Sequence, residues 1–419
     1  MKKMNENSLS ISSRKTYSRI MFWGVNIFTV LLILSFIMKL PESIHDWTSG
    51  WYAMDYSLGM SSRLFVGSLL KLIFPDFLYA KDVYTFLIIT ISLLLIFLIL
   101  LFAVSLKHAH QETMKTGLSF LIILYLASPG SPAYLWSAEN FGRLDTYLLL
   151  FTLLCILLYI KFTSYPARCL ILLLSGSLCL AIHQVYMFLF FPVVFIMLLL
   201  PLSFMKTGRK NVIYGGIVLF LLCIQFLYYQ FGASMSVGSL EELYGILTAR
   251  TDLPVMQNAL YFEYFADFKE QFINVALNEL GERIRYTAIA FLVLSPIFIL
   301  YAYLWLHIIK GEKNRTEKIK YGLFLLSLLS YVPAFALTKD WGRWTCALLL
   351  VLLLQIIIIA LEKKEAVLPA FHSLTNITWK LRYPLFIYIL FIACLKKYEC
   401  ILLPQSVDIF NFIYKLLRG

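Results

Sequence analysis

The segment from Phe86 to Leu106 reads FLIITISLLLIFLILLFAVSL, and it decides the fold because it contains no charged side chain. A helix rises about 1.5 Å per residue, so roughly 20 apolar residues cross about 30 Å of hydrocarbon. A strand of a membrane barrel would alternate apolar and polar residues, and this segment does not. We therefore predict that Phe86–Leu106 is a transmembrane helix.

Similar apolar runs occur on both sides of this segment. The chain has 419 residues, of which 60% are hydrophobic and 14% charged, and its mean hydropathy is +0.79. These values are typical of an integral membrane protein. We predict one all-α domain over residues 1–419, a polytopic transmembrane helix bundle of about eleven spans (ten to twelve). The other expected spans are Ile20–Leu40, Gly117–Ser128, Thr146–Phe162, Cys169–Ile182, Val185–Pro201, Val212–Phe231, Thr287–Ile309, Tyr321–Leu337, Trp344–Leu361 and Pro384–Leu395.

Basic residues lie in short clusters between these runs, so the net charge of +12 indicates orientation and not binding to nucleic acid. Placing the basic N-terminus, residues 1–19, in the cytoplasm puts successive clusters on the same side, as the positive-inside rule requires. We expect a multi-pass protein of the plasma (inner) membrane. The basic C-terminal segment Lys396–Gly419 favours the cytoplasm, although the span count places it outside. The clusters are Lys107/Lys115, Lys161/Arg168, Lys206/Arg209/Lys210, Lys310–Lys320 and Lys363/Lys364/Lys380/Arg382.

Two of the loops on the outer side are long. Residues 41–85 form a large first outer loop, in which the amphipathic stretch Ser62–Phe74 predicts a helix at the membrane interface. Residues 232–286 form the second, in which Ser239–Leu247 and Phe268–Leu280 have helical periodicity. Long loops of this kind often bind ligands or cover a site. Shorter outer loops are expected at Pro129–Asp145, His183-Gln184 and Thr338–Arg343.

The first outer loop places Asp46, Asp55 and Arg63 among several Trp and Tyr residues. One interpretation is an aromatic belt at the interface with solvated charges. The functional interpretation is a carboxylate held just above the membrane, with an arginine nearby.

Two later outer loops share a pattern of acid, aromatic, glycine and arginine. Glu139-Asn-Phe-Gly-Arg143 is followed closely by Asp145, and Asp340-Trp-Gly-Arg343 begins another apolar run. Glycine allows a sharp bend, and arginine offers a planar fork that matches a phosphate. The alternative is that each acid only neutralises its own arginine.

His183 lies in the middle of the long apolar stretch Cys169–Leu202, where a turn would bring it to the same outer side. A histidine in such a position is either a hydrogen-bonded packing residue or part of a site. No second histidine or carboxylate occurs at metal-ligand spacing from it. We therefore predict neither a metal site nor a cofactor.

The sequence has no Gly-rich phosphate loop and no GxSxG motif. Chemistry on the outer side must then use a substrate that already carries its energy. In this layout of loops the chain resembles polytopic glycosyltransferases of the GT-C type and bacterial polysaccharide polymerases. The resemblance implies transfer of a sugar from a polyprenyl-phosphate or diphosphate carrier in cell-surface polysaccharide synthesis, alongside other assembly proteins. It also implies an acidic base in the first outer loop and arginines on the phosphate.

Carried onto this sequence, these roles make Asp55 or Asp46 the base and Arg63, Arg143 and Arg343 the phosphate ligands. Four further residues, Glu139, Asp145, His183 and Asp340, are assigned to orienting or secondary roles. The adjacent acidic pair of many GT-C enzymes is absent, which leaves the identity of the base open. Two other functions compete, a transporter or flippase of lipid-linked saccharides and an acyltransferase of surface glycans, which would use His183 or His45 as base.

Overall fold

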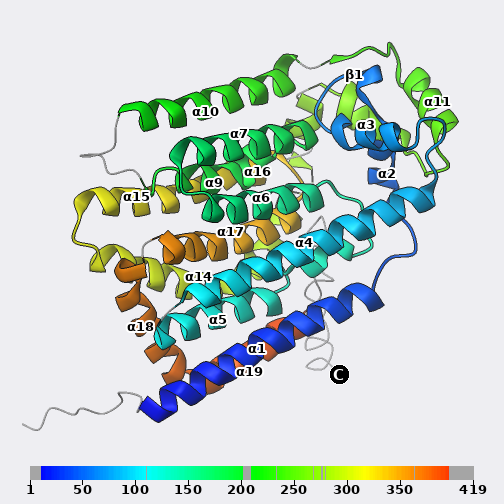
Figure 1. Cartoon of the computed structure of the whole chain (residues 1–419). Coiled ribbons are helices and arrows are strands. Elements are labelled where there is room, and N and C mark those ends of the chain that lie inside the picture. The colour runs from blue at the N-terminus through cyan, green and yellow to red at the C-terminus, as the bar shows by residue number, and fades with distance from the viewer. Residues whose placement is uncertain are drawn as a thin grey trace, which may run out of the picture.

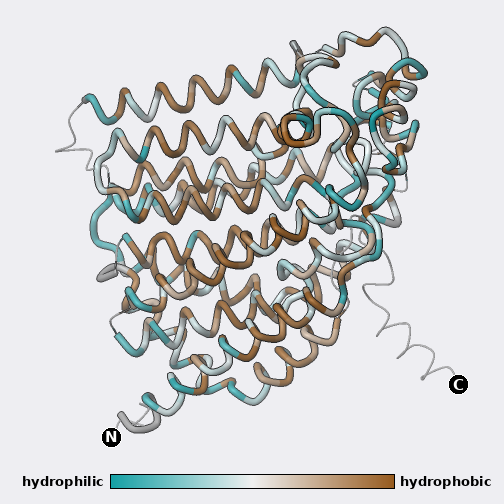
Figure 2. The backbone as a smooth tube through the Cα atoms, turned by 45° about the vertical axis from the view of Figure 1, so that its right-hand side comes forward, coloured by the Kyte–Doolittle hydropathy of each residue, from teal (hydrophilic) through white to brown (hydrophobic). Residues whose placement is uncertain are grey.

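A computed structural model of the chain describes residues 11–109, 111–201, 209–232, 234–267, 269–274, 277–278, 280–362 and 364–395. The long helices lie side by side, and their connections gather at two opposite ends (Figure 1). The middle of the helices is hydrophobic and both ends are more hydrophilic (Figure 2). This distribution is expected for helices that cross a bilayer and end in water.

The longer helices are α1 (Ile11–Met38), α4 (Ala80–His108), α5 (Glu112–Ala127), α6 (Asp145–Lys161), α7 (Tyr165–Ile182), α10 (Arg209–Leu227), α14 (Leu280–Gly311), α15 (Arg315–Leu326), α17 (Trp341–Glu362), α18 (Lys364–Lys380) and α19 (Arg382–Cys394). Shorter segments within the bundle are η2 (Pro132–Trp136), α8 (Tyr186–Leu189), α9 (Phe191–Met197), η6 (Ser327–Ser330) and α16 (Tyr331–Leu337).

Eight helical segments in the described part of the chain are long and apolar enough to cross a membrane, or nine if the bent pair α18–α19 counts as one span. The predicted all-α, multi-pass membrane architecture is therefore confirmed. The predicted count of about eleven spans is not. Helix α6 has only 17 residues, and α8 and α9 have 4 and 7.

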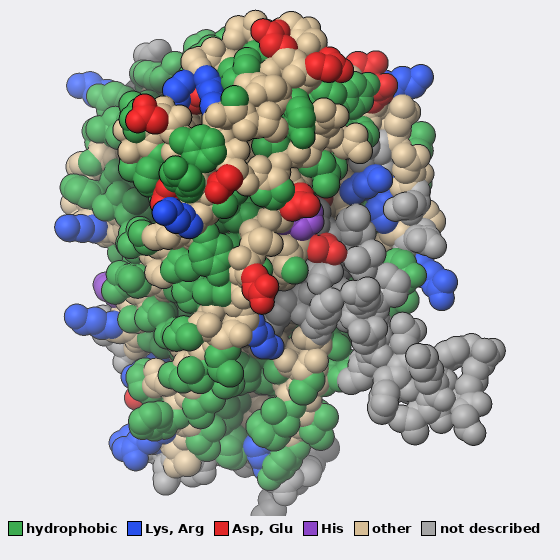
Figure 3. All heavy atoms as spheres, turned by 90° about the vertical axis from the view of Figure 1, so that its right-hand side faces the viewer, with side chains coloured by type: hydrophobic (Ala, Val, Ile, Leu, Met, Phe, Trp, Pro, Cys, Tyr) green, Lys and Arg blue, Asp and Glu red, His purple; other side chains and the backbone are tan. Residues whose placement is uncertain are grey.

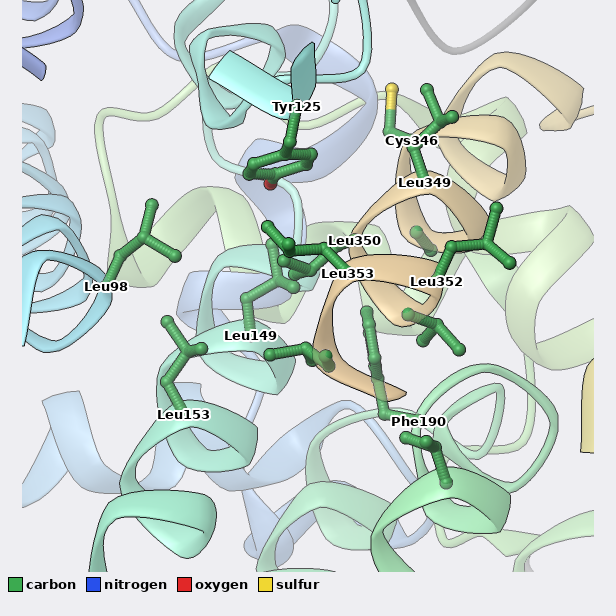
Figure 4. Close-up of a cluster of buried hydrophobic side chains, with 14 of the residues drawn as sticks. Leu98, Tyr125, Leu149, Leu153, Phe190, Cys346, Leu349, Leu350, Leu352 and Leu353 are labelled. Atoms are coloured by element: carbon green, nitrogen blue, oxygen red, sulfur yellow. The ribbon is translucent and has the colours of Figure 1, made fainter. Parts of the chain in front are cut away.

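The core of the bundle is formed by α5 and α17, whose side chains are almost all buried. Leucines of α17 pack against residues of α4, α6 and the α8–α9 segment (Figure 4). Lipid is as apolar as leucine, so close van der Waals contact holds such helices together. In contrast, α1 and α10 keep large apolar side chains exposed, including Trp23 and Phe220, as helices facing lipid should.

The connection between α7 and α8 is at His183, where the long apolar stretch was predicted to turn. Helix α7 ends at Ile182, His183 is extended with φ of −162° and ψ of 121°, and α8 begins at Tyr186. The predicted turn at His183 is thus confirmed, whereas the second predicted span, Val185–Pro201, contains the short helices α8 and α9. At the opposite end of the bundle, α18 and α19 meet at an angle of 87°. The sequence did not predict α18 as a helix, and Lys396–Gly419, Lys206 and Lys363 lie outside the described residues.

A small layer covers the end of the bundle at the right of Figure 1. It consists of α2 (Asp46–Ala53), η1 (Tyr56–Leu58), β1 (Gly59–Met60), α3 (Leu64–Ile73), η3 (Tyr228–Gly232), β2 (Ser234–Met235), α11 (Leu240–Arg250), α12 (Gln257–Leu260), η4 (Tyr261–Phe265) and η5 (Lys269–Asn274). The helices predicted over Ser62–Phe74 and Ser239–Leu247 are present as α3 and α11. The stretch Phe268–Leu280 instead contains the short η5 in its described part.

This layer joins the two long outer loops to each other. Strands β1 and β2 pair antiparallel, with Gly59 opposite Met235. Leu64 of the first loop is buried in a small apolar cluster with Leu243 and Leu247 of the second. The two loops, about 180 residues apart in the chain, therefore form one structural unit over the bundle.

Candidate functional site

A cavity of about 400 Å³ lies beneath this layer, and we call it the arginine cavity. Aromatic side chains form part of its wall, namely Trp47, Trp51, Phe262 and Phe272. Its polar lining consists of Arg63, Arg143, His183, Gln184, Glu263, Gln271, Thr338, Lys339, Asp340 and Arg343. Acidic and basic side chains gather on the same end of the molecule (Figure 3). Five of the predicted site residues thus meet in one cavity, although they come from four separate outer loops.

Arg63 is held in place by an unusual backbone conformation. It precedes α3 with φ of 75° and is the only non-glycine residue with positive φ among the described residues. Its backbone N–H donates to the carbonyl of Ala181 at 3.0 Å. The guanidinium lies 5.5 Å from the centre of the Trp51 ring and forms an ion pair with Glu263. Strain of this kind is often found at functional sites, and here it directs a guanidinium into the cavity.

Arg143 is positioned by the glycine that precedes it. Gly142 has φ of 94°, and a Cβ there would lie 2.6 Å from Ile44 and 2.9 Å from Thr48. The hydroxyl of Tyr52 donates to the Gly142 carbonyl at 2.7 Å. Only glycine fits this left-handed, crowded turn. The Arg143 Nε in turn donates to the Glu139 carbonyl at 3.4 Å, so the backbone of Glu139 orients the guanidinium.

Arg343 connects two helices through carboxylates. Its Nε donates to Asp145 Oδ2 at 2.6 Å, and its Nη1 is hydrogen-bonded to Asp340. The Arg343 and Asp145 side chains are only 2% and 4% exposed. Asp145 is the first residue of α6, and Arg343 lies in the first turn of α17. Asp145 and Asp340 therefore both contact the Arg343 guanidinium, and their orienting role stays a prediction.

The two acid-aromatic-glycine-arginine patterns have different structures. Gly142 makes a left-handed turn in a loop, whereas Gly342 is part of helix α17. Their similarity in sequence therefore does not extend to the backbone. Both nonetheless end in an arginine that lines the same cavity.

His183 is a hydrogen-bond donor toward the cavity. Its Nδ1 accepts from the backbone N–H of Val185 at 3.2 Å, so the neutral ring carries its proton on Nε2. Burial, and then the charges of Arg63, Arg343 and Arg143, hold the pKa of His183 well below its ordinary value. Nε2 lies 3.4 Å from Nη2 of Arg63. Two donors that face each other are both satisfied by one acceptor atom, such as an anionic oxygen.

The cavity has an excess of positive charge. Among the described residues, four cations line it with two carboxylates, Glu263 and Asp340, and a third carboxylate, Asp145, pairs with Arg343 without lining the cavity. Within the part of the chain that the structure describes, no carboxylate is within ion-pair distance of Arg143 or Lys339. Uncompensated cations in a partly buried cavity attract an anion strongly.

The two carboxylates predicted as the base do not line the arginine cavity. Asp46 is exposed in the first turn of α2. Asp55 accepts from the Ser57 N–H at 2.7 Å, from Lys71 Nζ at 2.9 Å and from Arg250 Nη1 at 2.7 Å. Burial alone would raise the pKa of Asp55, but the hydrogen bonds from Ser57 and Lys71 and the charge of Arg250 hold it below its ordinary value. This geometry fits a carboxylate that joins α3 to α11.

Two charged lining residues, Glu263 and Lys339, were not among the predicted site residues. Glu263 stands in the run Tyr261-Phe-Glu-Tyr-Phe265, where a single acid among four aromatics was the available signal. Lys339 directly precedes Asp340 in the predicted loop. Glu263 could not be placed from spacing, because only the folded outer layer brings η4 over the cavity. Lys339 was placed in the predicted outer loop but was given no role.

Comparisons of this chain with protein-family models, with curated proteins and with solved structures find no match.

Proposed function

We propose that this protein is a membrane glycosyltransferase or polymerase that uses a polyprenyl-phosphate or diphosphate sugar in cell-surface polysaccharide synthesis. One observation carries the proposal. Arg63, Arg143 and Arg343 come from three distant segments and line a single cavity at the end of a transmembrane helix bundle. Arginine forks match phosphate oxygens in geometry and charge, and a cavity at the ends of the helices suits a carrier whose tail remains in the membrane.

The residues that line the cavity make different contributions to binding the donor phosphate. Arg143 and Lys339 supply uncompensated positive charge, and His183 offers its Nε2–H as a neutral donor. Arg343 is fixed by Asp145 and Asp340, so its remaining donors are oriented before the substrate arrives. Donors fixed in advance stabilise developing charge without reorganisation at the moment of reaction.

The transfer reaction requires stabilisation of the negative charge on the leaving phosphate and removal of the proton from the acceptor hydroxyl. The acceptor hydroxyl oxygen attacks the anomeric carbon while the bond from that carbon to the phosphate oxygen breaks. The phosphate leaves with the electron pair, and the cavity cations stabilise it. The hydroxyl proton passes to a carboxylate. No nucleotide takes part in this step.

An acyltransferase has less support from the same geometry. Its base would be a histidine, and the candidates are His183 and His45. Each uses Nδ1 to accept a backbone N–H, at 3.2 Å from Val185 and Trp47 respectively. No carboxylate among the described residues orients either ring as a base through that nitrogen.

Binding of farnesyl phosphate, a short polyprenyl phosphate, tests the proposal. We expect purified protein in nanodiscs to bind it with a change in tryptophan fluorescence, because Trp47 and Trp51 line the cavity. Arg143→Gln should weaken the affinity about 10- to 100-fold, the range for hydrogen bonds to a charged group. The matched control is Arg285→Gln, since Arg285 is exposed and lines none of the cavities described here. Equal binding of farnesol and farnesyl phosphate contradicts the proposal, whereas phosphate-dependent binding without glycan synthesis supports a flippase.

A further inference from the structure

A second cavity of about 290 Å³ adjoins the arginine cavity. The two share Arg63, Gln184, Glu263 and Gln271 as lining residues. The rest of the second cavity has a different chemistry, with hydroxyl and amide side chains and aromatic rings, including Ser61, Ser62, Gln230, Ser234, Tyr229 and Tyr264. We call it the hydroxyl cavity. Its groups can exchange hydrogen bonds with sugar hydroxyls and stack on sugar rings.

One hydroxyl in this second cavity has an unmet hydrogen bond. The Tyr264 hydroxyl is buried and has no partner among the residues that the structure describes. Burial raises the pKa of Tyr264 to about 12, although the charge of Arg63 opposes this. The group therefore remains a donor at neutral pH. A buried donor without a partner costs free energy, and a bound polar ligand would remove that cost.

Glu263 stands between the two cavities. Within the described residues it is the only carboxylate that lines both. Its ion pair with Arg63 is largely shielded, with side chains 17% and 14% exposed. Asp340, the other carboxylate of the arginine cavity, is bound to Arg343 within its own segment. Glu263 is thus placed to contact one substrate in each cavity.

We propose that the hydroxyl cavity binds the saccharide acceptor and that Glu263 is the general base that accepts its proton. This inference rests on the proposed function, because it places the second substrate of the same reaction. It assigns the base to the long outer loop of residues 232–286. The resemblance to GT-C enzymes had instead implied a base in the first outer loop.

The Arg63–Glu263 ion pair also determines the order of events, because the donor phosphate must bind before Glu263 can act as base. While the pair is intact, the guanidinium neutralises the carboxylate and opposes its protonation. The donor phosphate competes for Arg63 and releases the carboxylate. The acceptor oxygen then attacks the anomeric carbon, its proton moves to Glu263, and the donor phosphate leaves with the electron pair of the broken C–O bond. Solvent takes the proton from Glu263 afterwards, so the carboxylate is available again.

The test combines two measurements on the same variants. Surface glycan is quantified in cells that lack the native gene and express each variant, with protein level checked by blot. Farnesyl phosphate affinity is measured on the purified variants. Glu263→Gln should lower glycan formation about 100- to 10,000-fold, the contribution of a general base. The same variant should bind farnesyl phosphate at least as tightly as the unmodified protein, because Arg63 no longer has a competing carboxylate.

Further variants separate the base from a structural ion pair. Glu263→Asp keeps a carboxylate and should retain partial glycan formation. Glu241→Gln changes an exposed acid of the same loop and should leave both measurements unchanged. The double variant Ser61→Ala/Ser234→Ala should lower glycan formation about 10-fold through the acceptor, with unchanged farnesyl phosphate affinity.

The outcomes distinguish this inference from the proposed function. Full glycan formation by Glu263→Gln, with normal farnesyl phosphate binding, overturns the role of Glu263 and leaves the donor site standing. Loss of farnesyl phosphate binding in Glu263→Gln assigns the carboxylate to holding Arg63 and also overturns it. Failure of the unmodified protein to bind farnesyl phosphate removes the proposed function itself.

Discussion

Arg343 is the residue at which a phosphate ligand and a structural ion pair can be told apart. Its guanidinium contacts Asp145 and Asp340 and lies 4.9 Å from the centre of the Trp344 ring. A lysine ammonium keeps the charge but cannot hold two carboxylates in the same plane. We expect Arg343→Lys to lose most glycan formation and to bind farnesyl phosphate about 10-fold more weakly.

Substitution of Asp340, the carboxylate paired with Arg343, provides a second test of the same role. Asp340→Asn should weaken activity about 10- to 100-fold, as loss of an orienting partner does at metal sites. The double variant Asp340→Asn/Arg343→Gln removes both charges of the i, i+3 pair. If the double variant forms glycan normally and binds farnesyl phosphate normally, Arg343 is only a structural residue of α17.

Charge and position in the sequence predicted five residues that line the arginine cavity. Other lining residues, such as Glu263, could not be predicted, because they come from segments far apart in the chain. Arg143 and Arg343 were predicted because each is charged and adjoins an apolar run, and His183 because it is polar in the middle of one. Glu263 was missed because its position among four aromatic residues of a long loop does not show which residues it faces. Its meaning depends on Arg63, which the structure brings beside it from 200 residues earlier.

At the scale of elements, Asp55 joins α3 to α11 through Lys71 and Arg250. We expect Asp55→Asn to lower the free energy of unfolding by about 1–3 kcal/mol, because two charged hydrogen bonds to a buried carboxylate are weakened. Hydrogen exchange in α11 should become faster. Thermal unfolding in detergent at neutral pH measures the first effect, and Asp76→Asn, an exposed acid of the same loop, is the control.

The effect of Asp55 should depend on pH in one direction. Its pKa in the folded protein is lowered, whereas an unfolded aspartate titrates near about 3.9. The stabilisation is therefore complete well above pH of about 4 and is lost as the pH falls through the folded pKa. The difference between the unmodified protein and Asp55→Asn should shrink below that pH. Unchanged stability together with abolished glycan would return Asp55 to the role of base.

Elements whose residues have a clear hydrophobic periodicity could be predicted from the sequence. Elements that depend on contacts between distant segments could not. Helices α3 and α11 and the turn at His183 followed from amphipathic or apolar runs with polar ends. Helix α18 was not predicted because Lys364–Lys380 is too polar for a span. The pairing of Gly59 with Met235 depends on contact between two distant loops, and no local pattern encodes it.

For the whole molecule, hydropathy predicted an all-α membrane bundle, but length alone did not settle the count of spans. Segments such as α6, α8 and α9 are too short by themselves, and they are enclosed by longer neighbours. A buried helix can be shorter than the bilayer because its ends contact protein and not lipid. The number of membrane crossings therefore depends on which end of the bundle each connecting loop lies at.

Reporter fusions determine that arrangement directly. The basic residues Lys107, Lys161 and Lys310 lie near the ends of α4, α6 and α14 that are opposite the arginine cavity. Because positive loops stay in the cytoplasm, fusions after Lys161 and after Lys210 should report cytoplasm. Fusions within Ser239–Glu282 should report the outer side. The reverse pattern would place the arginine cavity in the cytoplasm, beside soluble nucleotide sugars, and a donor activated only by its lipid carrier would no longer be required.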